Sequence, residues 1–285
     1  MDRIPEFVKA RGDGVAIQLA QWPGEGESVL CIHGLTANCR CWDRIAKTIS
    51  PEKRLLAMDL RGRGFSEKPE TGYSIEHHCR DIEAVVRDLG LEKVTVMGHS
   101  LGASIAAYFA ATRPGMVEKT VLVDGAGQLS EAQMEKVVAG IKLSLERLGK
   151  VFPSYENYME TLKRAPFFKA WNEYLDAYFQ YEIEAVEGGV RSRVYPEGIQ
   201  EELSNMRAFR IGDHYKDISC PVLILRATEG MMAPDDLLLP EDVAAHMAEE
   251  IPSAERVDIP GSNHYSMLFE PFEIRDRALR DFVCS

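Results

Sequence analysis

The sequence has no long apolar run. None of its hydrophobic stretches approaches the roughly 18 residues that a membrane-spanning helix requires. The N-terminal segment MDRIPEFVKARGDG also lacks the apolar core of a secretory signal peptide. We therefore expect a cytoplasmic protein that does not have a membrane as its partner.

Positive charge is in short supply. The chain has 33 Lys and Arg residues against 45 Asp and Glu residues, which gives a formal net charge of −12. Nucleic acids and anionic membrane surfaces attract proteins through clusters of Lys and Arg. The charge balance therefore argues against both as partners, and it leaves a small molecule as the expected one. The oligomeric state cannot be read from the sequence.

Cysteine motifs are missing as well. The six cysteines form no CxxC pair, and no Cys/His spacing matches a zinc site. They are Cys31, Cys39, Cys41, Cys79, Cys220 and Cys284. We expect reduced thiols in a reducing compartment and no metal site.

What the sequence does contain is an alternation of short β-branched runs with helical patterns. This alternation is typical of a mostly parallel sheet with helices on both faces. The predicted strands are residues 14–22, 28–34, 54–60, 93–99, 119–125, 221–227 and 255–260. The predicted helices are residues 43–49, 75–89, 101–112, 241–250 and 270–282.

One connection is far longer than the others. Residues 125–220 join two predicted strands, where a crossover needs only a dozen or so residues. The stretch FFKAWNEYLDAYFQYEIE (167–184) is rich in aromatics, which either pack on the sheet domain or form the underside of a cap over a pocket. We favour a helical cap over residues 128–212, with residues 1–127 and 213–285 as the core domain. Phe168, Trp171 and Tyr178 are the expected substrate contacts.

The segment VMGHSLGAS (96–104) contains the pattern G-x-S-x-G between a predicted strand and a predicted helix. A nucleophile on so sharp a turn occupies a strained backbone region, and the close strand–helix approach leaves room only for Gly98 and Gly102. The helix N-terminus beyond Ser100 favours developing negative charge. Ser100 is therefore the predicted nucleophile.

A serine hydroxyl needs a base, and seven histidines are available. His264 directly follows the last predicted strand, so its loop emerges at the same sheet edge as Ser100, and we predict it to be the base. His77, His78 and His246 fall on predicted helix surfaces, whereas His99 flanks the nucleophile and is expected to point away from it.

The developing oxyanion needs donors, and the segment IHGLTAN (32–38) leaves a strand near this edge. The backbone amides of Leu35 and Leu101 are the predicted pair. We interpret His33 as a structural residue.

The segments HGLTAN, MDLRGRGFSEKP, VMGHSLGA and GSNH together resemble the α/β-hydrolase fold superfamily over nearly the whole chain, with the long insertion matching least. The resemblance implies an eight-stranded sheet with the order Ser, acid, His along the chain. It also implies hydrolysis of an ester, amide, lactone or carbon–carbon bond without a cofactor.

The acid is missing from its usual position. Most members place it after the seventh strand in a G-x-x-D loop, where this chain has Ala227 and Gly230. Four carboxylates remain open, namely Asp124, Glu229, Asp235 and Asp236. We favour Asp124, which corresponds to the minority position after the sixth strand, although an aspartate also commonly begins a turn there.

Four functions fit these residues. The leading one is a serine hydrolase of carboxylic esters or related small acyl compounds. The segments NHYSML and SEKPETGYS also resemble hydrolases of succinate-type intermediates from pyridine-ring catabolism, so an amide or carbon–carbon bond is an alternative substrate. A cofactor-free perhydrolase or haloperoxidase and a small-molecule receptor are the others. Four arginines could reach a substrate carboxylate but are more readily read as solvated: Arg191, Arg193, Arg207 and Arg210.

Overall fold

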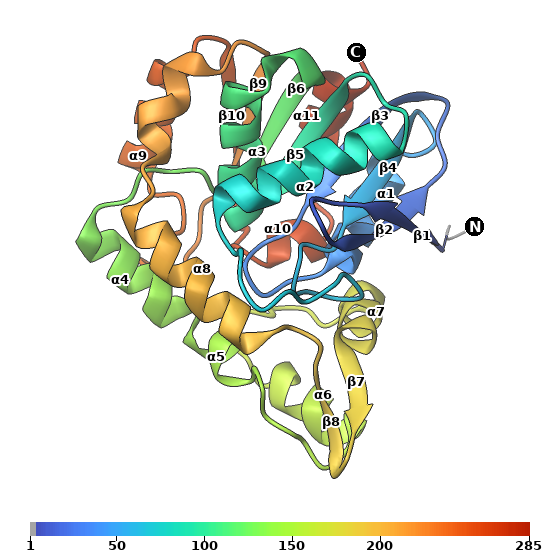
Figure 1. The fold of residues 1–285 in the computed structure, drawn as a ribbon. Helices are drawn as coiled ribbons and strands as arrows, with labels where there is room; N and C mark the ends of the chain where they lie inside the picture. The colour runs from blue at the N-terminus through green and yellow to red at the C-terminus, as the bar shows by residue number, and fades with distance from the viewer. Residues whose placement is uncertain (1–3) are drawn as a thin grey trace.

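The computed structural model describes residues 4–285. Within this range eight strands form one central sheet, in the order β1-β2-β4-β3-β5-β6-β9-β10 (Figure 1). They are β1 (Glu6–Arg11), β2 (Ala16–Trp22), β3 (Gly26–Ile32), β4 (Lys53–Met58), β5 (Val94–His99), β6 (Val117–Val123), β9 (Val222–Ala227) and β10 (Ala254–Ile259). The pairs β1–β2 and β2–β4 are antiparallel and the remaining pairs are parallel. The predicted eight-stranded, mostly parallel sheet is confirmed.

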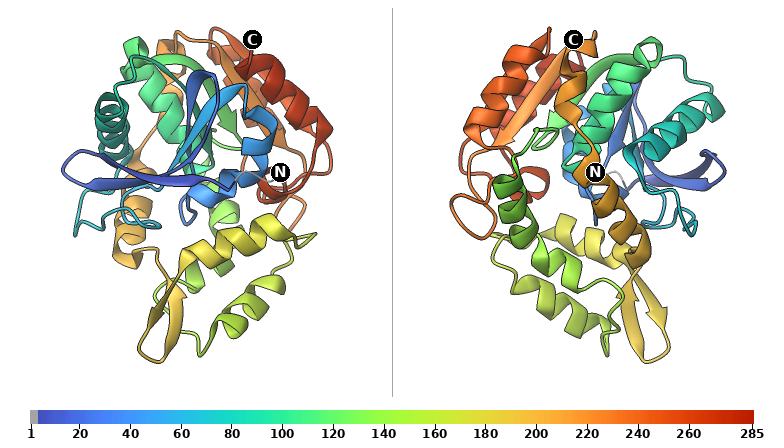
Figure 2. Two further views of the ribbon diagram at one scale, coloured as in Figure 1. Left: turned by 90° about the vertical axis from the view of Figure 1, so that its right-hand side faces the viewer. Right: turned by 60° about the vertical axis from the view of Figure 1, so that its left-hand side comes forward.

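Helices cover both faces of this sheet (Figure 2). One face packs against α2 (Ile75–Asp88), α3 (Leu101–Thr112) and α9 (Glu241–Glu250), and the other against α1 (Asp43–Ile49) and α11 (Glu273–Val283). The helix predicted over residues 270–282 begins only at Glu273, after the separate single turn α10 (Ser266–Phe269), because Pro271 has no N–H to continue a helix.

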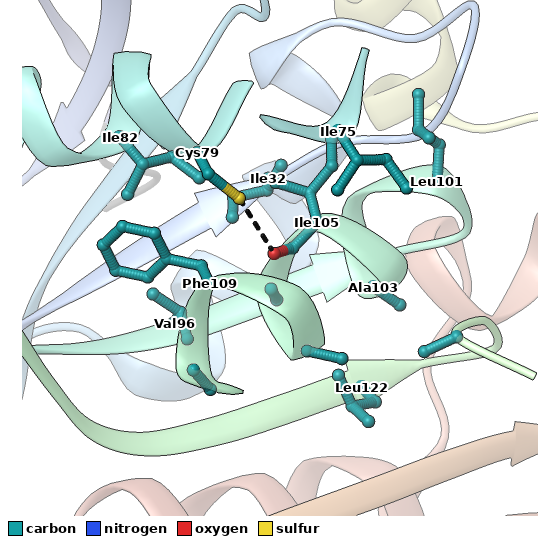
Figure 3. Close-up of a cluster of buried hydrophobic side chains, with 14 of the residues drawn as sticks. Ile32, Ile75, Cys79, Ile82, Val96, Leu101, Ala103, Ile105, Phe109 and Leu122 are labelled. Atoms are coloured by element: carbon teal, nitrogen blue, oxygen red, sulfur yellow. Dashed lines mark hydrogen bonds between the residues drawn. The ribbon is translucent and has the colours of Figure 1, made fainter. Parts of the chain in front are cut away.

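The core on the first face supports the nucleophile turn from below. Figure 3 shows a cluster that includes Ile105 and Phe109 of α3, Val96 of β5 and Leu122 of β6, with Cys79 of α2 donating its thiol to the Ile105 carbonyl at 3.7 Å. All five side chains are fully buried. Burying an aliphatic or aromatic side chain of this size contributes about 1.5–3 kcal/mol, so this contact anchors α3 firmly on the sheet.

The long insertion lies between β6 and β9, beneath the carboxyl ends of the parallel strands (Figures 1 and 2). It contains five helices, namely α4 (Glu131–Gly140), α5 (Lys142–Glu146), α6 (Tyr155–Lys163), α7 (Glu173–Glu182) and α8 (Pro196–Ala208). It also contains a hairpin of β7 (Ile183–Val186) and β8 (Gly189–Ser192), which the sequence did not lead us to expect, and the 3₁₀ segment Ile211–Asp217.

Candidate active site

Ser100 occupies the sharp turn between β5 and α3. Its backbone has φ 59° and ψ −121°, a region that L-residues rarely adopt and that is typical of functional sites. A Cβ atom at Gly98 would lie 2.0 Å from the Gly102 carbonyl oxygen, and one at Gly102 would lie 2.1 Å from that of Ile32. Both glycines are therefore required by close backbone approach, as the motif predicts.

His264 and Asp124 meet at the carboxyl edge of the sheet. The His264 Nδ1 atom lies 2.7 Å from Asp124 Oδ2, and both side chains are buried. The second carboxylate oxygen accepts the Ala227 amide at 3.1 Å. Asp124 itself has φ 43°, so a second strained residue stands in the site. An ionised carboxylate only accepts hydrogen bonds, which places the proton on His264 Nδ1 and leaves Nε2 as an acceptor.

The other three carboxylates have different partners. Glu229 and Asp235 are exposed and form ion pairs with Lys169 and Lys136, respectively. Asp236 is buried, but it accepts the backbone amides of residues 231–233 at 2.6–3.1 Å and so stabilises its own loop. None of the three contacts His264.

The loop after β3 lies against the nucleophile. A Cβ atom at Gly34 would stand 3.5 Å from Ser100 Oγ. The amides of Leu35 and Leu101 donate to no acceptor within residues 4–285, and both residues line the same cavity as Ser100. Two free amides near a nucleophile are what an oxyanion requires.

His33 orients this loop from behind. Its Nε2 accepts the Leu60 amide at 3.0 Å, so the ring proton lies on Nδ1, which donates to the Gly34 carbonyl at 2.7 Å. Burial lowers the pKa of His33 to about 3, which keeps the ring neutral and this tautomer in place. The interpretation of His33 as structural agrees with these contacts.

Two histidines make contacts that the sequence did not reveal. The ring of His99 stacks on that of His264 with centroids 4.3 Å apart, and its Nε2 donates to the His264 carbonyl at 2.9 Å. Burial, and then the neighbouring His264, lower the pKa of His99 well below its usual range. His78 was expected on a solvated surface, but it is fully buried because its Nε2 bonds to Glu202 of α8 at 2.7 Å.

Ser100 and His264 open into a cavity of about 400 Å³ between the sheet and the insertion. Most of its lining is apolar, with α4 contributing Met134 and Val137. Two arginines also line it. Arg147 is buried and paired with Glu182, whereas Arg164 is exposed and its side chain has no hydrogen bond or ion pair with any described residue. Neither arginine was singled out from the sequence, which carries no local motif for them.

Only two of the three predicted substrate contacts line the cavity. Phe168 and Tyr178 line the cavity, but Trp171 does not. Helix α7 begins only at Glu173, so Trp171 precedes it, and its ring stacks on that of Phe179 with centroids 5.7 Å apart. None of the four arginines Arg191, Arg193, Arg207 and Arg210 lines the cavity. Arg191, Arg207 and Arg210 are exposed, whereas Arg193 is half-buried, with its guanidinium 4.0 Å from the Phe65 ring centroid. Arg191 and Arg193 both pair with Glu184.

A family model of the alpha/beta hydrolase fold matches residues 27–271. The chain belongs to this family. The match covers most of the chain, and the arrangement of sheet and nucleophile turn described above is the one that the resemblance implies. The protein is accordingly a hydrolase of the α/β-hydrolase fold. No helix within residues 4–285 has both the length and the apolarity to cross a bilayer.

Individual relatives share both sequence and structure. A 2-(acetamidomethylene)succinate hydrolase of Mesorhizobium japonicum is 27% identical over 278 residues, which are 97% of this chain and 95% of the relative. A 3-hydroxybutyrate-oligomer hydrolase of Cupriavidus necator is 27% identical over 88% of this chain and 87% of the relative. The crystal structure of an E-2-(acetamidomethylene)succinate hydrolase superposes with a TM-score of 0.85 and 25% identity, covering 98% of this chain and all of that one.

Proposed function

We propose that the protein hydrolyses small acyl compounds through an acyl-enzyme on Ser100, with His264 as the base and Asp124 as the acid. The observation that carries the proposal is the 2.7 Å contact between the buried Asp124 and Nδ1 of His264, which lines the same cavity as Ser100. A base oriented by a buried carboxylate beside an elbow serine is the arrangement that activates a hydroxyl for nucleophilic attack.

The chemistry follows from the proton positions. His264 Nε2 accepts the Ser100 proton as Oγ attacks the substrate carbonyl, and it later returns a proton to the leaving group. Asp124 keeps the proton on Nδ1 and stabilises the imidazolium. The amides of Leu35 and Leu101 donate hydrogen bonds to the oxyanion of the tetrahedral intermediate. The residues around Ser100 hold its strained backbone in the conformation that the attack requires.

Carboxylic esters are our leading substrate class. The mainly apolar lining, including Phe168 and Tyr178, suits an apolar acyl or leaving group. We also propose that residues 128–212 act as a cap, because the insertion supplies both of these aromatics.

A second substrate class is favoured by the guanidinium group of Arg164, which is unpaired within residues 4–285. An acyl compound that carries a carboxylate, with an amide or carbon–carbon bond to be cleaved, would find Arg164 available as a charge partner at the cavity. The similarity to a 2-(acetamidomethylene)succinate hydrolase points in the same direction. Esters and anionic amides differ in the charge of the group that the cavity must bind.

The decisive experiment removes the nucleophile. Wild type and Ser100→Ala are assayed on a panel of p-nitrophenyl esters and of small carboxylated amides, and both are treated with a fluorophosphonate before intact-mass analysis. We expect turnover and a single covalent adduct only in wild type. Full turnover by Ser100→Ala would refute the proposal. Stoichiometric binding without turnover of any panel member would favour the small-molecule receptor, and peroxide-dependent halogenation would favour the perhydrolase.

A further inference from the structure

Three successive carbonyls of the loop at residues 34–37, here called the oxyanion loop, accept hydrogen bonds from side chains. The contacts are His33 Nδ1 to Gly34 O (2.7 Å), Arg63 Nε to Leu35 O (3.0 Å) and Arg147 Nη2 to Thr36 O (3.2 Å). The N–H and C=O of a trans peptide point in opposite directions. Holding these carbonyls therefore also fixes the direction in which the loop's amides point.

Both arginines are buried and reach the loop from outside it. Arg63 follows β4 and is fully buried, while Arg147 lies just beyond α5 and is 7% exposed. Arg63 donates a further hydrogen bond to the Arg61 carbonyl at 2.9 Å, and Arg147 donates one to the Ser144 carbonyl. Their guanidinium groups are thus fully engaged on one side by backbone carbonyls.

On the other side each guanidinium pairs with a carboxylate of the insertion. Arg63 pairs with Glu202 of α8, which also accepts from His78, and Arg147 pairs with Glu182 of α7 at 2.9 Å. Both glutamates are essentially inaccessible to solvent. Helices α7 and α8 of the insertion are therefore connected, through Arg147 and Arg63, to consecutive peptides of the oxyanion loop by charge-assisted hydrogen bonds.

A buried ion pair is weak evidence of a stabilising role, because the cost of removing two charges from water offsets most of their attraction. A well-packed apolar pair would serve stability as well. The Leu35 amide shares its peptide with the Gly34 carbonyl, which His33 holds, whereas Arg63 and Arg147 hold the carbonyls of the next two peptides. What an apolar pair would not supply is directed N–H donors on these two carbonyls. Such donors matter beside Gly34, because a glycine lets the adjoining backbone rotate at little steric cost and the Leu35 amide would turn with it.

We infer that Arg63 and Arg147 are positioning residues that hold the oxyanion loop in its binding geometry, and that they make this geometry depend on docking of helices α7 and α8. The inference rests on the proposed serine hydrolase function. The pair of Arg63 and Glu202 gives the clearest test of this role, because neither residue lines the cavity and neither can contact substrate.

The test compares two buried arginines of one short segment. Arg63→Gln and Glu202→Gln break the pair behind the loop. Arg61→Gln is the matched control, because Arg61 forms an equally buried ion pair with Asp81, at 2.7 Å, but contacts neither the loop nor the insertion. For each variant we measure the thermal midpoint, kcat and KM on the best substrate of the panel, and the affinity for an alkyl boronic acid that forms a tetrahedral adduct on Ser100.

Loss of an oxyanion donor lowers kcat about 100- to 1000-fold, so loss of its support should lower kcat about 10- to 100-fold with KM changed by less than about threefold. Boronate affinity should fall in parallel with kcat for Arg63→Gln and Glu202→Gln. The control should lose thermal stability but keep kcat and boronate affinity within about threefold. A wild-type kcat in folded Arg63→Gln, or an equal loss of kcat in Arg61→Gln, would overturn the inference.

The design separates this inference from the proposed function. If wild type forms no boronate adduct and Ser100→Ala keeps its turnover, the proposed function fails. If Ser100→Ala is inactive but Arg63→Gln and Glu202→Gln keep the wild-type kcat and boronate affinity, the proposed function stands and the positioning role is refuted. Should Arg63→Gln not fold, Glu202→Gln keeps the loop donor in place while removing its tie to α8, and it decides the question.

Discussion

Replacing Asp124 with asparagine keeps the size of the side chain and changes only its hydrogen-bonding character. The new carboxamide could still accept the Ala227 amide through its carbonyl oxygen, as Asp124 Oδ1 does at 3.1 Å. Its NH₂ group would then face His264 Nδ1, where Oδ2 now stands at 2.7 Å. A donor at this position forces the His264 proton onto Nε2, so the ring can no longer accept the proton of Ser100.

The magnitude follows from this change of tautomer. In a known Ser-His-Asp triad the same substitution lowers kcat about 10⁴-fold, or about 5.5 kcal/mol of transition-state stabilisation. We expect a loss of about 10³- to 10⁴-fold here, measured as kcat/KM on a short p-nitrophenyl ester. Glu229→Gln and Asp235→Asn are matched controls that remove exposed carboxylates, and both should stay within about twofold of wild type.

The result that would refute this reasoning is equally specific. If folded Asp124→Asn kept more than a tenth of the wild-type rate, the contact with His264 would not be catalytic. A loss confined to Glu229→Gln would mean that the loop after β9 carries the acid in a conformation other than the one described. The circular dichroism spectrum of each variant establishes that it is folded before its rate is compared.

Three further predictions concern the cavity and the buried charges. Arg164→Gln should raise KM about tenfold or more for a carboxylated substrate and leave a neutral ester unchanged; equal effects on both would refute the charge-partner role. Phe168→Ala should raise KM across an ester chain-length series, whereas Trp171→Ala should not, and the opposite order would refute the assigned lining. Burial alone would raise the pKa of Glu202, but His78 and Arg63 hold it at about 2, below the ordinary 4.5. This lowered pKa stabilises the folded state by on the order of 3 kcal/mol above about pH 5, and the stabilisation is lost as the pH falls toward 2. The urea midpoint should therefore drop more steeply on acidification in wild type than in Glu202→Gln.

The central strands and the sharp turn at Ser100 could be predicted because their determinants are local. Alternation of β-branched runs reveals β3, β5, β6 and β9, and the G-x-S-x-G pattern is confined to five residues. Strand β1 was missed because it lies at the sheet edge with four exposed positions, so its sequence carries charge and no continuous apolar run. Pro271 was the available signal for the break between α10 and α11.

The remaining features depend on contacts that are distant in sequence. Arg63 lies in the segment MDLRGRGFSEKP, but nothing in that segment points to its partner Glu202, which is 139 residues away. The aromatic stretch at 167–184 predicted an apolar lining, yet only the point at which α7 begins separates Trp171, which does not line the cavity, from Tyr178, which does. Asp124 was favoured by its position after the sixth strand, and its contact with His264 is a matter of three-dimensional geometry.

The attachment of His264 has a consequence for how the site responds to ligand. Asp124 holds one ring nitrogen, and His99 holds both the ring face and the backbone carbonyl of the same residue. Because His99 immediately precedes Ser100, His264 is attached to the same backbone segment that carries Ser100. Few degrees of freedom therefore remain between the proposed nucleophile and the proposed base. Under the proposed function, a substrate would therefore meet Ser100 and His264 already held relative to each other before it arrives.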